Sequence, residues 1–130
     1  FEAVMAAFKL PKDDPEQQAK RQREIEAATL AAAKVPLEVA RKALQVIELA
    51  LVAVTRGNLN AISDGASGAA LARAALNSAG YNVRINVSSL DAAPEGQALL
   101  VSLREIEMHA AMIEAAIKNQ LVARGGFSLE

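Results

Sequence analysis

The sequence predicts an all-α protein that folds as an up-and-down bundle of long helices. Hydrophobic residues make up 52% of the 130 residues and aromatic ones only 3%, so the core must consist of Ala, Leu, Val and Ile. Alanine-rich chains with many Leu, Glu, Lys and Arg residues strongly favour helix. Apolar residues recur at steps of three and four, which is the spacing of helix faces. The length fits a single domain.

The composition also excludes several classes of function. The net charge is -1, which gives no electrostatic reason to expect a nucleic-acid or membrane partner. The chain has no cysteine and one histidine, so a disulfide framework, thiolate chemistry and the usual kind of zinc site all lack their residues. No apolar run is long enough to span a membrane and nothing resembles a signal peptide. We therefore expect a cytoplasmic protein.

The chain opens on a short helix that no capping residue precedes. Residues 1–10 carry apolar side chains spaced for one face, namely Val4, Met5 and Phe8. A second helix is expected from about Pro15 to Lys34, with Asp14 as its N-cap and Gln17 at the capping-box position. Its first half is charged and should be solvated. Its second half should turn inward through Ile25, Ala28, Leu30 and Ala32.

A break is expected at Val35-Pro36, because a proline inside a helix removes a hydrogen bond and clashes with the preceding turn. Pro36 suits the first position of a third helix, which should end at about Arg56. This helix has the clearest amphipathic pattern in the chain. Its expected apolar face consists of Val39, Ala43, Val46, Ile47, Ala50 and Val54.

A glycine-asparagine pair separates the third helix from the fourth. Gly57 and Asn58 tolerate the left-handed conformation with which many helices end. Ser63 or Asp64 is the predicted N-cap of the fourth helix, over residues 63–89. Residues 81–87 alternate and are β-branched, so a short strand is the competing prediction. Helix is favoured, because no other strand exists for this segment to pair with.

The last helix is expected to run from about Pro94 to Ala123 and to stop at Gly125-Gly126. Its apolar residues recur at alternating steps of four and three, as in a coiled-coil seam. The seam consists of Leu99, Leu103, Ile106, Ala110, Ile113, Ile117 and Leu121. In an enzyme this seam should hold the bundle together. In a non-catalytic interaction module, the alternative function, it would be the partner surface.

Polar residues that a helical bundle does not need occur in two groups. The first lies in or beside loops and comprises Lys12, Asn58, Ser63 and Asp64. The second is Asn82 and Asn86, four residues apart on the fourth helix. Both groups lie along a stripe of mostly small and polar residues, which comprises Asp64, Gly68, Leu71, Ala75, Ser78, Asn82 and Asn86.

The length of the fourth helix separates these two groups. In a continuous helix Asp64 and Asn86 lie roughly 33 Å apart. They cannot share one small pocket within a single chain. Either only one group is functional, or two fourth helices pack antiparallel in a symmetric dimer. The dimer would bring Asp64 of one copy toward Asn82 and Asn86 of the other, and the small residues would permit that approach.

Structural explanations compete with these functional ones. Gly57-Asn58 also fits a simple C-cap, Ser63-Asp64 an N-cap, and Lys12 an ordinary loop lysine. The two asparagines differ, because asparagine is a poor helix former and both lie beside β-branched residues. We expect Asn82 and Asn86 to be buried amides, either in a structural network or in contact with a ligand.

Four phrases, in this order and spacing, resemble the cyclodeaminase/cyclohydrolase family. They are Phe8-Lys9-Leu10-Pro11-Lys12, Val35-Pro36-Leu37-Glu38-Val39-Ala40, Gly57-Asn58-Leu59-Asn60-Ala61-Ile62-Ser63-Asp64 and Asn82-Val83-Arg84-Ile85-Asn86. The family comprises the C-terminal domain of formiminotransferase-cyclodeaminase and the stand-alone methenyltetrahydrofolate cyclohydrolases. Its members begin with a helix, a proline-glycine-rich loop and another long helix before the segment that starts here at Phe1. The resemblance therefore implies an N-terminally incomplete domain over residues 1–130.

The resemblance implies an all-helical homodimer that acts on one-carbon derivatives of tetrahydrofolate. The cyclohydrolase reaction adds water to 5,10-methenyltetrahydrofolate and gives 10-formyltetrahydrofolate. The cyclodeaminase reaction closes the formimino carbon of 5-formiminotetrahydrofolate onto N10 and releases ammonia. Neither reaction needs a metal or a redox cofactor, and the folate is the substrate. The sequence leaves the choice between the two reactions open.

The resemblance also implies roles for individual residues. Asp64 is the expected general acid or base, or the stabiliser of the cationic carbon. Hydrogen bonds to the pterin or to the attacking water would come from Asn58, Asn82 and Asn86. Ser63 is also expected to bind the substrate. Lys12 would pair with the glutamate carboxylates of folate. The interaction-module alternative predicts instead that apolar replacements at the two α-helical asparagines are tolerated.

Overall fold

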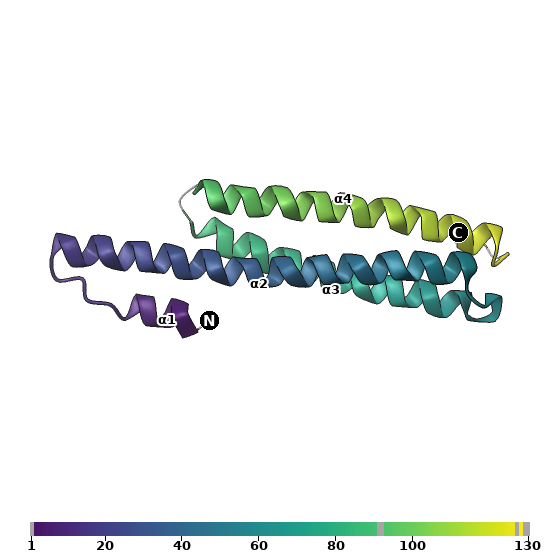
Figure 1. Cartoon of the computed structure of the whole chain (residues 1–130), viewed down its shortest axis with the longest axis horizontal. Coiled ribbons are helices and arrows are strands. Elements are labelled where there is room, and N and C mark those ends of the chain that lie inside the picture. The colour runs from purple at the N-terminus through teal and green to yellow at the C-terminus, as the bar shows by residue number, and fades with distance from the viewer. Residues whose placement is uncertain (1, 91–92, 127, 129–130) are drawn as a thin grey trace.

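The computed structural model describes residues 2–90, 93–126 and 128. Over these residues the chain is all-α. The elements are α1 (Glu2–Phe8), α2 (Pro15–Arg56), the 3-10 turn η1 (Leu59–Ala61), α3 (Ile62–Ser88) and α4 (Pro94–Ala123). The three long helices run up and down along one rod (Figure 1), and α2 packs against both others. The predicted bundle is confirmed, and residues 81–87 are helical.

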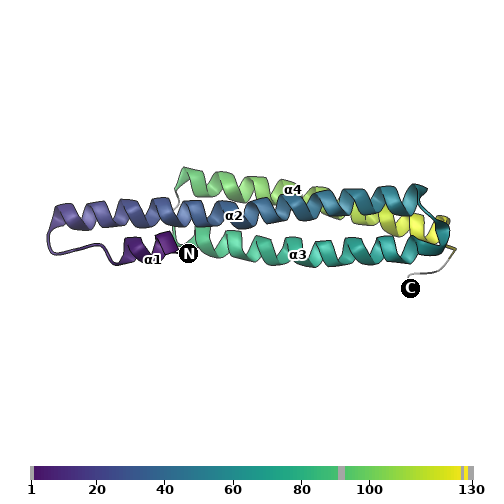
Figure 2. The same ribbon diagram turned by 60° about the horizontal axis from the view of Figure 1, so that its bottom comes forward.

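The N-terminal part of α2 extends beyond the ends of α3 and α4, where only α1 lies beside it (Figures 1 and 2). The predicted apolar face of α1 is wrong. Met5 and Phe8 are 43% and 51% exposed, whereas Ala7 is buried. Because α1 has a single helix to pack against, Ala7 is its one fully buried residue and Val4 is half-buried. The Phe8 ring lies beside Arg21 of α2, and the distance from the ring centroid to the guanidinium carbon is 5.4 Å.

The predicted start of α2 is confirmed. The Asp14 side chain accepts a hydrogen bond of 2.8 Å from the backbone N–H of Gln17, and Pro15 occupies the first helical turn. The Gln17 side chain reaches back to the N–H of Asp13 at 3.1 Å, one residue earlier than a standard capping box requires. The sequence signal therefore fixes the N-terminus of the longest helix.

The predicted break at Pro36 is wrong, because α2 is one uninterrupted helix of 42 residues that includes Pro36. An interior proline costs about 3 kcal/mol relative to alanine. The buried residues of α2 keep their spacing of three and four on both sides of Pro36. Leu37, the next residue, is 3% exposed. Burying such a leucine alone contributes about 1.5–3 kcal/mol. The buried stripe comprises Thr29, Ala33, Leu37, Ala40, Ala43, Ile47, Ala50 and Val54.

This stripe corrects the predicted apolar faces of α2 in part. Val39 and Val46 are each 47% exposed, and the stripe runs through Leu37 and Ala40 instead. Toward the N-terminus, the deepest residues are Thr29 and Ala33. The residues expected to turn inward there are only half-buried, because they flank this stripe and do not lie on it; they are Ile25, Ala28, Leu30 and Ala32.

The core lies where the three long helices meet. Each contributes one large and completely buried side chain, namely Ile47, Leu76 and Leu103. The predicted seam of α4 is confirmed, since all of its members are buried except the half-buried Leu99. A seam inside the bundle cannot serve as a partner surface, so that part of the interaction-module prediction is wrong. Among the described helices, none combines the length and the apolar character needed to cross a membrane.

The turn between α2 and α3 differs from the prediction in its chemistry. Helix α2 ends at Arg56 as predicted, but Gly57 has a φ of -74° and is not left-handed. Glycine is needed there because a Cβ would collide with the carbonyl oxygen of Ala53. Neither Ser63 nor Asp64 caps α3, which begins at Ile62 without a side-chain cap. Instead the Asn58 side chain accepts from the N–H of Asn60 at 3.0 Å, and η1 leads directly into α3.

Two glycines near the start of α3 should respond oppositely to alanine. A Cβ at Gly65 would lie 2.9 Å from Cγ1 of Val54, which is completely buried, whereas a Cβ at Gly68 would meet nothing within 4 Å. We expect Gly68→Ala to raise the free energy of unfolding by about 1 kcal/mol. Gly65→Ala should lower it, because overpacking costs about 1–3 kcal/mol. Urea denaturation of both variants checks this, and equal shifts would contradict the packing.

Candidate functional site

Three predicted site residues lie together where α2 passes into α3. Asn58 precedes η1, and Ser63 and Asp64 lie in the first turn of α3; all three side chains are exposed. The N–H groups at a helix start carry partial positive charge, which stabilises a carboxylate such as that of Asp64. The Asn58 oxygen accepts the N–H of Asn60, so its NH2 group remains to donate to a ligand. This cluster thus presents a carboxylate and an amide donor on one short exposed segment.

The asparagine pair near the other end of α3 is not buried, so that prediction is wrong. Asn82 is exposed and Asn86 half-buried. The side-chain NH2 of Asn82 donates to the carbonyl of Ser78 at 3.0 Å, and that of Asn86 to the carbonyl of Asn82 at 2.7 Å. These local bonds satisfy the donors without a buried network. The amide oxygens remain available to accept from a ligand.

The fold does not bring all predicted site residues together within one chain. Asp64 and Asn86 belong to the same uninterrupted helix, which keeps them roughly 33 Å apart. Lys12 precedes α2 whereas Asn58 follows it, and 42 helical residues span roughly 63 Å. Lys12 is exposed in the loop between α1 and α2, and Figure 1 shows that this loop lies at the end of the rod opposite to the turn between α2 and α3. A single chain therefore assembles only the cluster of Asn58, Ser63 and Asp64.

The predicted stripe on α3 lies at the surface. Leu71 in its middle is 74% exposed. A Cβ at Gly65 would lie 3.6 Å from that of Ala53, so Ala53 is on the side of α2 nearest to α3. Val46 and Val39 repeat this position at seven-residue steps and are also exposed. Val39, Val46 and Ala53 thus form an exposed column on α2. We call this column, together with the stripe on α3, the α2–α3 face.

A separate groove lies between α3 and α4. Its volume is about 450 Å³, which is within the range of small-molecule sites. Its lining comprises Ala66, Ala69, Ala70, Glu114, Ile117, Lys118 and Leu121. None of these residues belongs to the predicted site. Asp64 is two positions from Ala66 and so lies on nearly the opposite side of α3.

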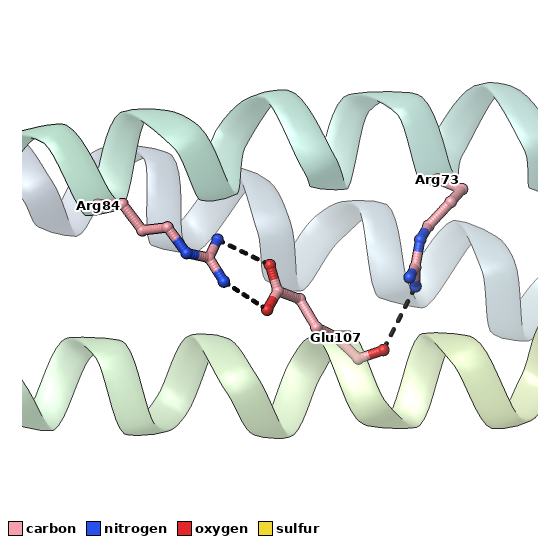
Figure 3. Close-up of polar contacts among 3 residues, drawn as sticks. All are labelled: Arg73, Arg84 and Glu107. Carbon is pink, nitrogen blue, oxygen red and sulfur yellow. Dashed lines mark hydrogen bonds and ion pairs between the residues drawn. The ribbon is translucent and has the colours of Figure 1, made fainter.

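Arginines that the sequence reasoning did not single out hold α3 against α4. Figure 3 shows Arg84 donating two hydrogen bonds, of 2.9 and 2.7 Å, to the carboxylate of Glu107. Arg73 donates to the backbone carbonyl of Glu107 at 3.3 Å and lies 3.5 Å from the Glu114 carboxylate. The hydrogen bonds to Glu107 raise the pKa of the Arg84 guanidinium. These contacts hold α3 against α4, on the side of α3 that is away from the α2–α3 face.

Comparison with known proteins identifies the family of this chain. The sequence profile of formiminotransferase-cyclodeaminase matches residues 1–105. The chain belongs to the formiminotransferase-cyclodeaminase family. All six predicted site residues lie in the part that matches the family, whereas Glu107, Glu114 and Arg124 lie beyond it. The family resemblance of the four phrases is therefore confirmed.

A curated relative is the methenyltetrahydrofolate cyclohydrolase of Methylorubrum extorquens. The chain is 43% identical to it over 91 residues, which are 70% of this chain and 44% of the relative. The match thus spans less than half of the length of the relative.

Proposed function

We propose that this chain is the helical part of a tetrahydrofolate one-carbon enzyme, and that its reaction is the hydrolysis of 5,10-methenyltetrahydrofolate to 10-formyltetrahydrofolate. The observation that carries the proposal is the family match over residues 1–105. Within that part of the chain, the exposed Asp64 lies in the first turn of α3 and the exposed Asn58 lies just before it. The cyclohydrolase reaction is preferred over the cyclodeaminase reaction because the relative from Methylorubrum extorquens carries the former name.

The proposed chemistry needs a base beside a cationic carbon. The methenyl carbon of the substrate is bonded to two nitrogens and shares a positive charge with them, which attracts the Asp64 carboxylate. Asp64 accepts a proton as water attacks that carbon. The bond from the carbon to N5 then breaks as Asp64 returns this proton to N5, the remaining hydroxyl proton passes to solvent, and the formyl group stays on N10. Asn58 donates to the oxygen that develops negative charge.

The asparagine pair joins this site only if two copies associate. The stripe on α3 is nearly symmetric about Ala75, since Asp64 and Asn86 are each 11 residues from it, and Gly68 and Asn82 are each seven. A two-fold axis at Ala75 with antiparallel α3 helices would place Asp64 opposite Asn86 of the second copy. The exposed valines of the α2–α3 face would be buried in the same contact. We propose this homodimer, with one site formed by both copies at each end.

Assays of both reactions test the proposed activity. The protein is supplied with 5,10-methenyltetrahydrofolate, whose absorbance is lost on hydrolysis, and separately with 5-formiminotetrahydrofolate, from which released ammonia is measured. Hydrolysis without ammonia release is expected. Ammonia release with negligible hydrolysis would assign the cyclodeaminase reaction, and neither activity in a folded dimer would contradict an enzyme.

Asn82→Leu should weaken folate binding without unfolding the chain. The change removes an amide oxygen that can accept from the pterin, and a lost hydrogen bond to a neutral group weakens binding by about tenfold. Leucine is also a better helix former than asparagine, so thermal stability should not fall. Asn119→Leu, at an exposed position on α4, is the matched control. Equal affinities for 5-formyltetrahydrofolate in both variants would favour a purely structural asparagine.

A further inference from the structure

The C-terminal end of α2 is held by a residue from the far end of the chain. Arg124, which follows α4, donates from Nη1 to the carbonyl of Val54 at 2.8 Å and from Nη2 to the carbonyl of Gly57. The two partners are 70 and 67 residues away in the sequence. Both carbonyls belong to the helix end, where backbone acceptors lack intrahelical partners. Arg124 therefore caps a helix to which it does not belong.

The geometry suits a guanidinium in particular. The end of a helix carries partial negative charge, so a cation is favoured there. The two carbonyls are three residues apart, and the planar fork of arginine can donate to both at once, whereas a lysine ammonium acts as a point charge. Both contacts are partly buried, which limits competition from water. The exit of the chain from α2 is thus fixed in position.

That exit leads directly to the cluster of predicted site residues. Asn58 follows Gly57, its side chain holds η1, and η1 continues into the first turn of α3. On the other side, Gly65 packs against Val54, the same residue whose carbonyl Arg124 binds. The turn that carries Asn58, Ser63 and Asp64 is therefore held at both of its ends by contacts to the last turn of α2.

We propose that Arg124 is a positioning residue that keeps this turn in the arrangement that binds the folate. The role in ligand binding rests on the proposed function, whereas the holding of the turn by Arg124 does not. Without Arg124, the last turn of α2 loses two hydrogen bonds and the turn should open locally. If the binding arrangement is then populated a tenth of the time, the apparent Kd rises about tenfold.

The experiment compares Arg124→Ala, Arg124→Lys and Arg73→Ala with the unchanged chain. Arg73→Ala is the matched control, because it also removes an arginine that donates to a backbone carbonyl and bridges helices, but away from the turn. Amide hydrogen exchange at Gly57 and Asn60, whose N–H groups are hydrogen-bonded, reports the turn, and calorimetry with 5-formyltetrahydrofolate reports binding. We expect faster exchange and an apparent Kd about tenfold higher for Arg124→Ala. Arg124→Lys should recover part of both effects.

The controls separate the possible failures. Arg73→Ala should leave exchange in the turn and the Kd unchanged even if it lowers thermal stability. Equal losses of affinity in the Arg73 and Arg124 variants would overturn the proposal, because they would reflect general destabilisation. Faster exchange with an unchanged Kd would also overturn it. If neither the unchanged chain nor any variant binds the ligand, the proposed function fails, and the role of Arg124 in ligand binding fails with it. The exchange data would still show whether Arg124 holds the turn.

Discussion

Asp64→Asn should abolish most of the turnover and leave the fold intact. The amide cannot accept a proton from the attacking water, and the loss of a positioned general base lowers rates by about 100-fold to 10,000-fold. The side chain is exposed in the first turn of α3 and caps no helix. Stability should therefore fall only by the loss of a charge at a helix start, about 0.3–1 kcal/mol. Steady-state assays with 5,10-methenyltetrahydrofolate measure the effect on kcat.

A matched carboxylate serves as the control for this prediction. Glu95 lies in the first turn of α4, is exposed, and has the same relation to a helix start. Glu95→Gln should cost similar stability and leave kcat unchanged. A normal kcat for Asp64→Asn would remove this residue from the mechanism, whereas equal losses in both variants would indicate an effect of charge alone.

The same variant tests whether each site is formed by two copies. In the proposed homodimer, one copy supplies Asp64 and the other supplies Asn82 and Asn86. Mixing Asp64→Asn chains with Asn82→Leu chains, after unfolding and refolding together, should form heterodimers in which one site has both changes and the other has none. With random pairing about a quarter of all sites become intact. Activity that stays at the level of the separate variants would contradict the shared site.

Leu103→Ala should cause a large loss of stability. Leu103 is completely buried and lies where α4 meets the other long helices, and removing such a leucine side chain costs about 2–5 kcal/mol. The helices around the cavity are long and held along their whole length by the other core residues, so they cannot easily move together to fill it. Chemical denaturation of the purified chain gives the change in free energy of unfolding.

Leu49→Ala is the control for the core, since it makes the same change at a position on α2 that is 68% exposed. Its effect should stay within about 0.5 kcal/mol. Similar losses for Leu103→Ala and Leu49→Ala would show that the two faces have been assigned wrongly.

The sequence predicted the helices well where local chemistry decides, and less well where packing does. The start of α2 follows from Asp14 and Pro15, and the seam of α4 from its regular spacing. Pro36 misled the prediction because its local cost is visible in the sequence, whereas the burial that offsets it depends on α3 and α4. Val39 and Val46 were placed in the core for a related reason. An apolar side chain indicates that a face can be buried, but not which of two adjacent apolar faces the neighbouring helices cover.

The candidate site divides in the same way. The clustering of Asn58, Ser63 and Asp64 could be predicted because these residues are neighbours in sequence. The exposure of Asn82 and Asn86 could not, because each amide binds a carbonyl one turn earlier and needs no tertiary partner. The capping of α2 by Arg124 joins residues 67 and 70 positions apart, and no local pattern signals such a contact. A cation beside the final glycines was the one available hint.

Calorimetry with 5-formyltetrahydrofolate, a stable analogue, tests the central claim most directly when the mass of the protein is measured at the same concentration. The proposal predicts saturable binding of one ligand per copy, in a particle with twice the mass of the chain. A well-folded dimer that binds no ligand would contradict the folate assignment. Saturable binding by a monomer would contradict the site shared between two copies.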